Sequence, residues 1–205
     1  MSAAASRVLV LGAGGHAKVV VATLQAAGAE VAAVLDDAPG RQGASLGGVP
    51  VGGPVAAVIG GAAICAIGDN RARQGVVAGL ATAWATAVHP SAVVHESVLL
   101  GPGTVVFAGA VVQPDAVLGA HVIVNTGATV DHDCRLGDFV HVAPGAHLCG
   151  GVTVDEGALL GVGCAVAPGV RIGAWATVGA AAAVVADVPA GATVIGVPAQ
   201  ARPPR

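Results

Sequence analysis

The chain has 205 residues and a formal net charge of −3, with a single lysine and no tyrosine. A nucleic-acid groove needs clustered cations and stacking aromatic side chains, and this composition excludes both. A mean hydropathy of +0.80 raises the question of a membrane protein. However, the uncharged stretch 97–114 contains Gly101-Pro102-Gly103 and follows a six-residue period, which is not typical of a membrane-spanning helix. We therefore expect neither nucleic acid nor a membrane as a partner.

The N-terminus and the cysteines indicate the compartment. The first residues, MSAAASRVLVLGAGG, lack a secretory pattern because the apolar segment runs straight into a glycine-rich turn. The cysteines show neither CxxC spacing nor a Cys/His zinc pattern, and we interpret them as small buried thiols in a reducing compartment. They are Cys65, Cys134, Cys149 and Cys164. Together these features predict a cytoplasmic protein.

The first forty residues predict a βαβ unit. Arg7–Leu11 is a short apolar strand that ends in a glycine-rich turn, and the helical stretch VVVATLQAAG follows as far as Gly28. Val31–Asp37 is then a second buried strand that ends in two carboxylates. In such a unit the N-terminus of the helix is open to an anion.

The next fifty residues lead out of this unit. We expect residues 38–60, rich in Gly, Pro and Ala, to form a loop with little structure of its own. A third strand at Ala63–Gly68 leads into Asp69-Asn70-Arg71, which should cap the helix RARQGVVAGLATAWA. His89-Pro90 breaks that helix. The sequence thus predicts a Rossmann-like α/β domain at 1–88 and a second domain at 89–205.

The glycine-rich turn also fits a dinucleotide fingerprint. Gly12, Gly14 and Ala17 match G-x-G-x-x-A, and Asp36 follows about 20 residues on, where such a fingerprint has a ribose-binding acid. A nicotinamide-dependent oxidoreductase is therefore an alternative function. The region is too short for two mononucleotide-binding halves and has no second glycine-rich turn. We accordingly expect the glycines to cradle the phosphates or sugar of one nucleotide.

Residues 92–187 form sixteen consecutive hexads without an insertion or deletion. The third position is always aliphatic, and the first is always Ala, Val, Thr or Cys. Hexapeptide repeats specify a parallel β-helix, in which three hexads make one coil and residues 18 apart stack. At the fourth position Gly101, Gly119 and Gly137 lie 18 apart, where we expect a left-handed φ. The N-terminal domain and the tail after Asp187 should cover the two ends.

One stretch, Asn125–Cys134, places an amide, an imidazole and two acids in a scaffold otherwise built of Ala, Val and Gly. His132 stacks between Pro114 and Gly150, and we expect Gly150 to leave the space above the imidazole empty. A histidine beside a carboxylate is the arrangement of a general base. Either Asp131 or Asp133 could be that carboxylate.

Zinc binding is a competing use of the histidines. His89 and His95, and likewise His141 and His147, are six apart and lie on adjacent faces of the coil. No two of the seven histidines are 18 apart, so a zinc site would need several subunits, as in the γ-type carbonic anhydrases. A zinc hydratase therefore stays as a further alternative. His141 and His132 are half a coil apart and could face each other only across an interface between copies.

Five motifs in order resemble a known family. They are GAGGHAKVV, LDD at Leu35–Asp37, AIGDNRAR at Ala66–Arg73, NTGATVDHDCRLG at Asn125–Gly137 and IGVPAQ at Ile195–Gln200. Over nearly its whole length the chain resembles the bacterial hexapeptide-repeat acetyltransferases of UDP-linked 4-amino sugars and GDP-perosamine. It is also similar to the sialic-acid O-acetyltransferases. The resemblance implies a left-handed β-helix, a homotrimer, and acetyl-CoA bound in a groove between neighbouring helices.

The resemblance also implies residue roles. His132 would be the general base for the 4-amino group of a nucleotide-linked 4-amino-4,6-dideoxy sugar, with Asp133 supporting it. The nucleotide-sugar site would comprise Gly14, Gly15, His16, Asp36, Asp37, Gly68 and Asn125. The acetyl-CoA site would comprise His141, Gly150, Val162 and Pro168, with Gly196–Ala199 closing over it. No serine or cysteine is placed as a nucleophile beside His132, so we expect direct transfer. O-acetylation is the nearest alternative, and the sequence leaves open UDP or GDP and the stereochemistry of the sugar.

Overall fold

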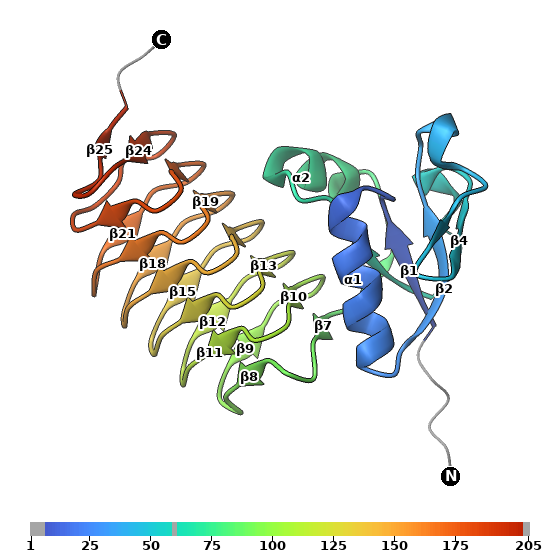
Figure 1. Cartoon of the computed structure of the whole chain (residues 1–205), viewed down its shortest axis with the longest axis horizontal. Coiled ribbons are helices and arrows are strands. Elements are labelled where there is room, and N and C mark those ends of the chain that lie inside the picture. The colour runs from blue at the N-terminus through green and yellow to red at the C-terminus, as the bar shows by residue number, and fades with distance from the viewer. Residues whose placement is uncertain (1–6, 59–60, 203–205) are drawn as a thin grey trace.

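The computed structural model describes residues 7–58 and 61–202. An N-terminal α/β domain and a long β-solenoid follow one another along the chain and pack side by side (Figure 1). The last strand of the first domain ends at Trp84 and the first solenoid strand begins at Ala87. We place the junction between these two residues, close to the predicted boundary at residue 88.

The N-terminal domain is the predicted Rossmann-like unit. Its sheet has the strand order β3-β4-β2-β1-β5-β6, and β1 pairs in parallel with both β2 and β5. Only β3 runs antiparallel, against β4. The elements are β1 (Arg7–Leu11), α1 (Gly15–Ala26), β2 (Glu30–Leu35), η1 (Pro39–Arg41), β3 (Ser45–Leu46), β4 (Val49–Gly52), η2 (Val55–Ala57), β5 (Ala62–Cys65), α2 (Asn70–Ala78) and β6 (Ala83–Trp84).

Two sequence predictions for this domain are wrong. Residues 38–60 are not a plain loop, because β4 adds a parallel strand beside β2 and buries Val49 and Val51; positions 59 and 60 lie outside the described residues. The second helix ends at Ala78 instead of continuing to residue 85, since Gly79 terminates it and β6 follows. The Asp69 cap is confirmed, because its Oδ1 accepts a hydrogen bond from the N–H of Ala72 at 2.8 Å.

The solenoid consists of two-residue strands that pair in parallel with the strand 18 residues later, as the hexads predict. Three sheets form its faces, and each is named here by its first strand. The β7 sheet contains β7 (Ala87–Val88), β10 (Val105–Val106), β13 (Ile123–Val124), β16 (His141–Val142), β19 (Leu159–Leu160), β22 (Thr177–Val178), β24 (Thr193–Ile195) and β25 (Gln200–Ala201). The β8 sheet contains β8 (Val93–Val94), β11 (Val111–Val112), β14 (Thr129–Val130), β17 (His147–Leu148), β20 (Ala165–Val166) and β23 (Ala183–Val184). The β9 sheet contains β9 (Leu99–Leu100), β12 (Val117–Leu118), β15 (Arg135–Leu136), β18 (Thr153–Val154) and β21 (Arg171–Ile172).

The core of the solenoid is one column of buried side chains. Third-position aliphatics and first-position small residues form a single cluster along the axis, including Cys134 and Cys164. Cys65 is also buried, whereas Cys149 is exposed, so the prediction of buried thiols is wrong for Cys149. At the C-terminal end, β24 pairs with β22 and β25 folds back on β24, so the tail extends the β7 sheet as a cap.

The corner glycines have a different role from the predicted one. The left-handed φ occurs at the sixth position of the hexads, for example at Asp133 (φ 60°) and Phe139 (φ 58°). Fourth-position glycines are needed because the next coil passes close by: a Cβ on Gly137 would lie 2.7 Å from the amide nitrogen of Glu156. The prediction of a left-handed φ at Gly137 and its equivalents is therefore wrong.

The N-terminal domain packs on the side of the solenoid and not on its end (Figure 1). The expected end cover is incomplete, since Val94 and Leu100 of the first coil are only half-buried. Helix α2 lies instead along the corner between the β9 and β7 sheets. Most of its contacts fall on or beside one sixth-position column, whose residues lie 18 apart: His121, Phe139, Gly157 and Trp175.

The few aromatic residues of the chain gather at this domain interface. Phe139 stacks on His121 at 5.2 Å between ring centroids, and Trp84 meets the same imidazole edge-on at 4.7 Å. Phe107 packs into the core of the N-terminal domain, and the guanidinium of Arg71 lies 4.2 Å from the ring centroid of Trp175. All four Phe and Trp side chains thus join the two domains. In the described part of the chain, neither helix is long and apolar enough to cross a bilayer.

Candidate active site

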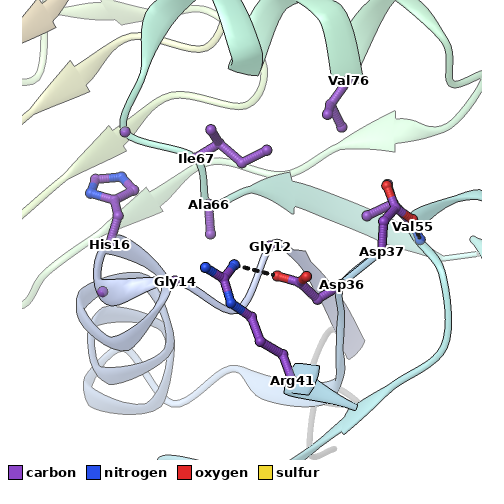
Figure 2. A pocket seen from close by; sticks show the side chains of 12 residues that line it. Gly12, Gly14, His16, Asp36, Asp37, Arg41, Val55, Ala66, Ile67 and Val76 are labelled. Atoms are coloured by element: carbon purple, nitrogen blue, oxygen red, sulfur yellow. Dashed lines mark hydrogen bonds and ion pairs between the residues drawn. The ribbon is translucent and has the colours of Figure 1, made fainter. Parts of the chain in front are cut away.

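A cavity of about 400 Å³ opens in the N-terminal domain where the carboxyl ends of β1, β2 and β5 meet the start of α1 (Figure 2). In open parallel sheets ligands bind at this edge. The residues that line it are Gly12, Gly14, Gly15, His16, Asp36, Asp37, Arg41, Val55, Ala66, Ile67, Gly68 and Val76. Except for Asn125, every residue expected at the nucleotide-sugar site is among them; their contact with a ligand stays a prediction.

Asp36 organises the floor of this cavity. Its carboxylate accepts hydrogen bonds from the N–H groups of Ala13 (2.6 Å) and Ala38 (2.8 Å) and pairs with the Arg41 guanidinium at 3.0 Å. Burial raises the pKa of Asp36, but these hydrogen bonds and the charge of Arg41 outweigh it and hold the pKa below its usual value. Asp36 therefore fixes the glycine-rich turn, and half-exposed Arg41 places positive charge at the cavity. Asp37 accepts a hydrogen bond from the N–H of Val55 at 2.8 Å.

Arg41 is a cavity residue that the sequence did not reveal. It lies in the short helix η1, inside the segment expected to be a plain loop. A lone arginine among glycines and prolines has no spacing that marks it. The nearest signal is the carboxylate pair that precedes it in the chain.

A histidine pair connects the cavity to the solenoid. His141 Nδ1 lies 3.1 Å from the carbonyl oxygen of Gly68, and its Nε2 lies 3.1 Å from Nδ2 of Asn125. The ring of His16 lies 6.1 Å from that of His141. Burial, and after it neighbouring charge, lowers the pKa of both imidazoles to about 4. Both rings are therefore neutral at physiological pH.

His132 lies at the corner between β14 and β15, with its side chain 61% exposed. Its Nδ1 is 2.8 Å from the Asp133 carboxylate. Asp131 instead accepts a hydrogen bond from the backbone N–H of His132 at 2.8 Å. The hydrogen bond to Asp133, and after it the charge of Asp131, raises the pKa of His132 above its usual value. Of the two carboxylates left open by the sequence, Asp133 orients the ring.

The expectation of empty space above His132 is wrong. A Cβ added to Gly150 would lie 2.5 Å from both Cε1 and Nε2 of the imidazole, so the ring itself rests over Gly150. Because a carboxylate only accepts, Nδ1 carries the proton that bonds Asp133, and in the neutral imidazole Nε2 keeps a free lone pair. This is the protonation state that a general base requires.

The four expected acetyl-CoA residues fall into two groups. Gly150 and exposed Pro168 lie 18 and 36 residues after His132, in the same corner column. His141 belongs to the β7 sheet, and exposed Val162 follows β19 of that sheet. One chain therefore does not bring all four together. Within the described ranges, no three His, Cys, Asp or Glu side chains gather closely enough to hold a metal ion.

A hexapeptide β-helix that exposes a His–Asp pair, joined to a Rossmann-like domain with a nucleotide-sized cavity, defines the class of hexapeptide acyltransferases. The profile of the PglD N-terminal domain family matches residues 7–80. PerB from Caulobacter crescentus, solved with CoA and GDP-perosamine, is 44% identical at a TM-score of 0.90, over 99% of this chain and 100% of that one. The acetyltransferase domain of PglB from Neisseria gonorrhoeae FA1090, solved with acetyl coenzyme A, is 40% identical at a TM-score of 0.91, over 97% of this chain and 100% of that one.

WeeI from Acinetobacter baumannii AYE is more distant, at 28% identity and a TM-score of 0.85, over 95% of this chain and 99% of that one. A comparison with curated protein sequences gave no match. Identity of 40–44% over the full length of two solved acetyltransferases confirms the predicted family. The chain belongs to the left-handed β-helix N-acetyltransferases of nucleotide-linked amino sugars, which use acetyl-CoA.

Proposed function

We propose that the chain transfers the acetyl group of acetyl-CoA to the 4-amino group of a 4-amino-4,6-dideoxy sugar linked to GDP or UDP. The observation that carries this proposal is the hydrogen-bonded Asp133–His132 pair, whose Nε2 keeps a free lone pair on an exposed corner of the solenoid. The cavity of the N-terminal domain, of about 400 Å³, supports this proposal as the site that would bind the nucleotide. PerB, which is 44% identical, was solved with CoA and GDP-perosamine.

In the proposed mechanism the transfer is direct. The neutral sugar amine attacks the thioester carbonyl carbon, and Nε2 of His132 takes the proton that the nitrogen loses. The C–S bond breaks, and the imidazolium returns its proton to the sulfur of the departing CoA. Asp133 steadies the imidazolium, while a backbone N–H group would stabilise the oxyanion.

The nucleotide would lie over the glycine-rich turn. Gly14 caps α1 without a side chain, so the first N–H groups of the helix are available to a diphosphate. Arg41, held by Asp36, adds a cation at the same cavity. We assign Gly14, Gly15 and Arg41 to the diphosphate and the other cavity residues to the base and sugar. These other residues include His16, Asp36, Asp37 and Gly68, which the sequence predicts for the nucleotide-sugar site as a whole.

Two copies of the chain would complete one active site. His132 lies between the β8 and β9 sheets, whereas the cavity opens beside the β7 sheet and does not include His132. Asn125 and Val162 follow strands of the β7 sheet, and Gly150 and Pro168 share the column of His132. We therefore propose a homotrimer in which the β7-sheet side of one subunit faces the His132 column of the next. Acetyl-CoA would lie in the groove between them.

Replacing His132 by alanine tests the function. The purified full chain is assayed with acetyl-CoA and with GDP- or UDP-linked 4-amino sugars, and N-acetylated product is measured by mass spectrometry. We expect loss of about 100- to 10,000-fold in kcat with the fold unchanged. Full acetyl transfer by His132→Ala would contradict the proposal. Native mass spectrometry tests the proposed trimer. An enzyme that is active as a monomer would contradict it.

A further inference from the structure

Arg73 is the most deeply buried cation of the described chain, with 1% of its surface exposed. All five N–H groups of its guanidinium have acceptors. Three of these are groups of the N-terminal domain: the carbonyls of Ile67 (2.9 Å) and Gly68 (3.3 Å) and Oδ1 of Asn70 (2.9 Å). The other two are solenoid carbonyls, at His121 (3.1 Å) and Phe139 (2.8 Å). No carboxylate of the described residues forms an ion pair with Arg73.

Arg73 is connected to the nucleotide cavity through the carbonyl of Gly68. This oxygen accepts from Nη1 of Arg73 and also from Nδ1 of His141, at 3.1 Å. A carbonyl oxygen has two lone pairs, so these two donors use its full capacity. Gly68 also lines the nucleotide cavity, and its position is therefore shared by the cavity, the guanidinium and the imidazole.

The bond to Gly68 determines which nitrogen of His141 is protonated. A carbonyl only accepts, so Nδ1 carries the proton and Nε2 is the acceptor for the amide of Asn125 at 3.1 Å. The orientation of Asn125 is confirmed at its other end, because its Oδ1 accepts from the N–H of Thr126 at 2.8 Å. Asn125 Nδ2 keeps a second N–H with no acceptor among the described residues.

We propose that Arg73 is a positioning residue for acetyl transfer: by fixing the carbonyl of Gly68, it holds His141 as the Nδ1–H tautomer and thereby orients the amide of Asn125 toward the sugar. This inference rests on the proposed function in its last step, the approach of Asn125 to the sugar. Burial, and after it the positive charge of Arg73, also lowers the pKa of His141 to about 4, which keeps this imidazole neutral.

A purely structural use of Arg73 would not need this geometry. Contacts to His121 and Phe139 dock α2 on the solenoid, and they are made by Nε and Nη2. Nη1 takes no part in docking and binds only Ile67 and Gly68, which belong to the same segment as Arg73. One edge of the guanidinium therefore joins the domains, while the other holds the cavity carbonyl.

Arg73→Lys keeps the positive charge but removes the planar fork, and the tautomer of His141 then reports whether the fork acted through Gly68. Arg71→Lys is the matched control, since Arg71 lies on the same helix, is exposed and contacts Trp175 instead of Gly68. The first measurement is the tautomer of His141 in the ligand-free full chain, by ¹⁵N NMR of the imidazole. We expect the Nδ1–H form in the wild type and in Arg71→Lys, and a mixture of tautomers in Arg73→Lys.

The second measurement is a double-mutant cycle on kcat with Asn125→Ala. We expect Arg73→Lys to lower kcat by about 10- to 100-fold with the KM for acetyl-CoA unchanged. Asn125→Ala in that background should then cause no further loss. Multiplying losses, or an unchanged His141 tautomer in Arg73→Lys, would overturn the inference.

Two further points keep the test decisive. Should Arg73→Lys not fold, Arg73→Gln supplies the same two measurements, since its amide still donates but lacks the fork. A wild type that shows the Nδ1–H tautomer but transfers no acetyl group would refute the proposed function and the final step to Asn125. In that case the NMR comparison still decides whether Arg73 controls the tautomer.

Discussion

Gly150→Ala should remove most activity without unfolding the chain. The new Cβ would lie 2.5 Å from Nε2 and Cε1 of His132, whereas ordinary contacts begin at 3.4 Å. The imidazole must therefore move by about 0.9 Å. A displacement of about 1 Å at a reacting group costs about 100-fold in rate, so we expect kcat to fall by about that factor. The backbone of Gly150 is not in the left-handed region, and an exposed side chain can move aside, so stability should change little.

The assay is steady-state acetyl transfer combined with a thermal melt. Gly173→Ala is the control, because its Cβ would lie 2.8 Å from Cα of Ala190, a backbone atom that cannot rotate away. We expect this control to lower the Tm and to keep the kcat of the folded enzyme. Full activity in Gly150→Ala would show that catalysis does not depend on the position of His132 over Gly150. An equal drop in Tm in both variants would show that the imidazole does not move aside.

Three further predictions follow from charge and burial. Asp133→Asn should lower kcat and move the acid limb of the pH profile of kcat to lower pH, because the hydrogen bond to Asp133 is the main cause that raises the pKa of His132. Asp131→Asn should move the acid limb less, because the charge of Asp131 is the smaller cause. Identical pH profiles for the two variants would contradict this ranking of the two carboxylates. Arg41→Gln should raise the KM for the nucleotide sugar by about 10- to 100-fold and leave the KM for acetyl-CoA unchanged, because one charge-assisted hydrogen bond is worth about 1.5–3 kcal/mol. Isothermal titration with the nucleoside diphosphate checks this loss of affinity. Stability should fall as pH drops from about 6.5 toward 4, because buried His16 and His141 (pKa about 4) bind fewer protons than the unfolded chain; a Tm constant over this range would refute it.

The solenoid could be predicted almost completely from the sequence, because its order is periodic. The aliphatic residue at the third position of every hexad predicts the core, and the 18-residue stacking places Gly150 against His132. His132 stood out because polar residues interrupt that pattern. The role of the corner glycines could not be predicted from the period. A glycine can be needed for a left-handed φ or for close approach of the next coil, and the distance between coils, which decides between the two, is not encoded in the repeat.

The N-terminal domain and its docking were less predictable. The glycine-rich turn and the two carboxylates predict where the cavity lies. By contrast, β4 is a short strand whose pairing with β2 depends on long-range contacts, so it could not be predicted. Nothing in the spacing of the predicted helix marks Arg73 as a buried residue. Its burial depends on carbonyls that lie 48 and 66 residues away in sequence, at His121 and Phe139. Such non-local contacts leave no local signature in the sequence.

The docking of α2 on one corner column limits where whole coils of the solenoid can be inserted or deleted. Asn70 donates to the carbonyls of Gly157 and Ala158, and Arg71 covers Trp175, so the helix is fitted to the corners of particular coils. Removing 18 residues between His121 and Trp175 would keep every strand in register but would place the wrong corner beneath α2. Extra coils beyond Trp175 meet no such partner in α2. By this reasoning, insertions and deletions of whole coils are tolerated toward the C-terminal end, whereas the coils beside the first domain have a fixed number.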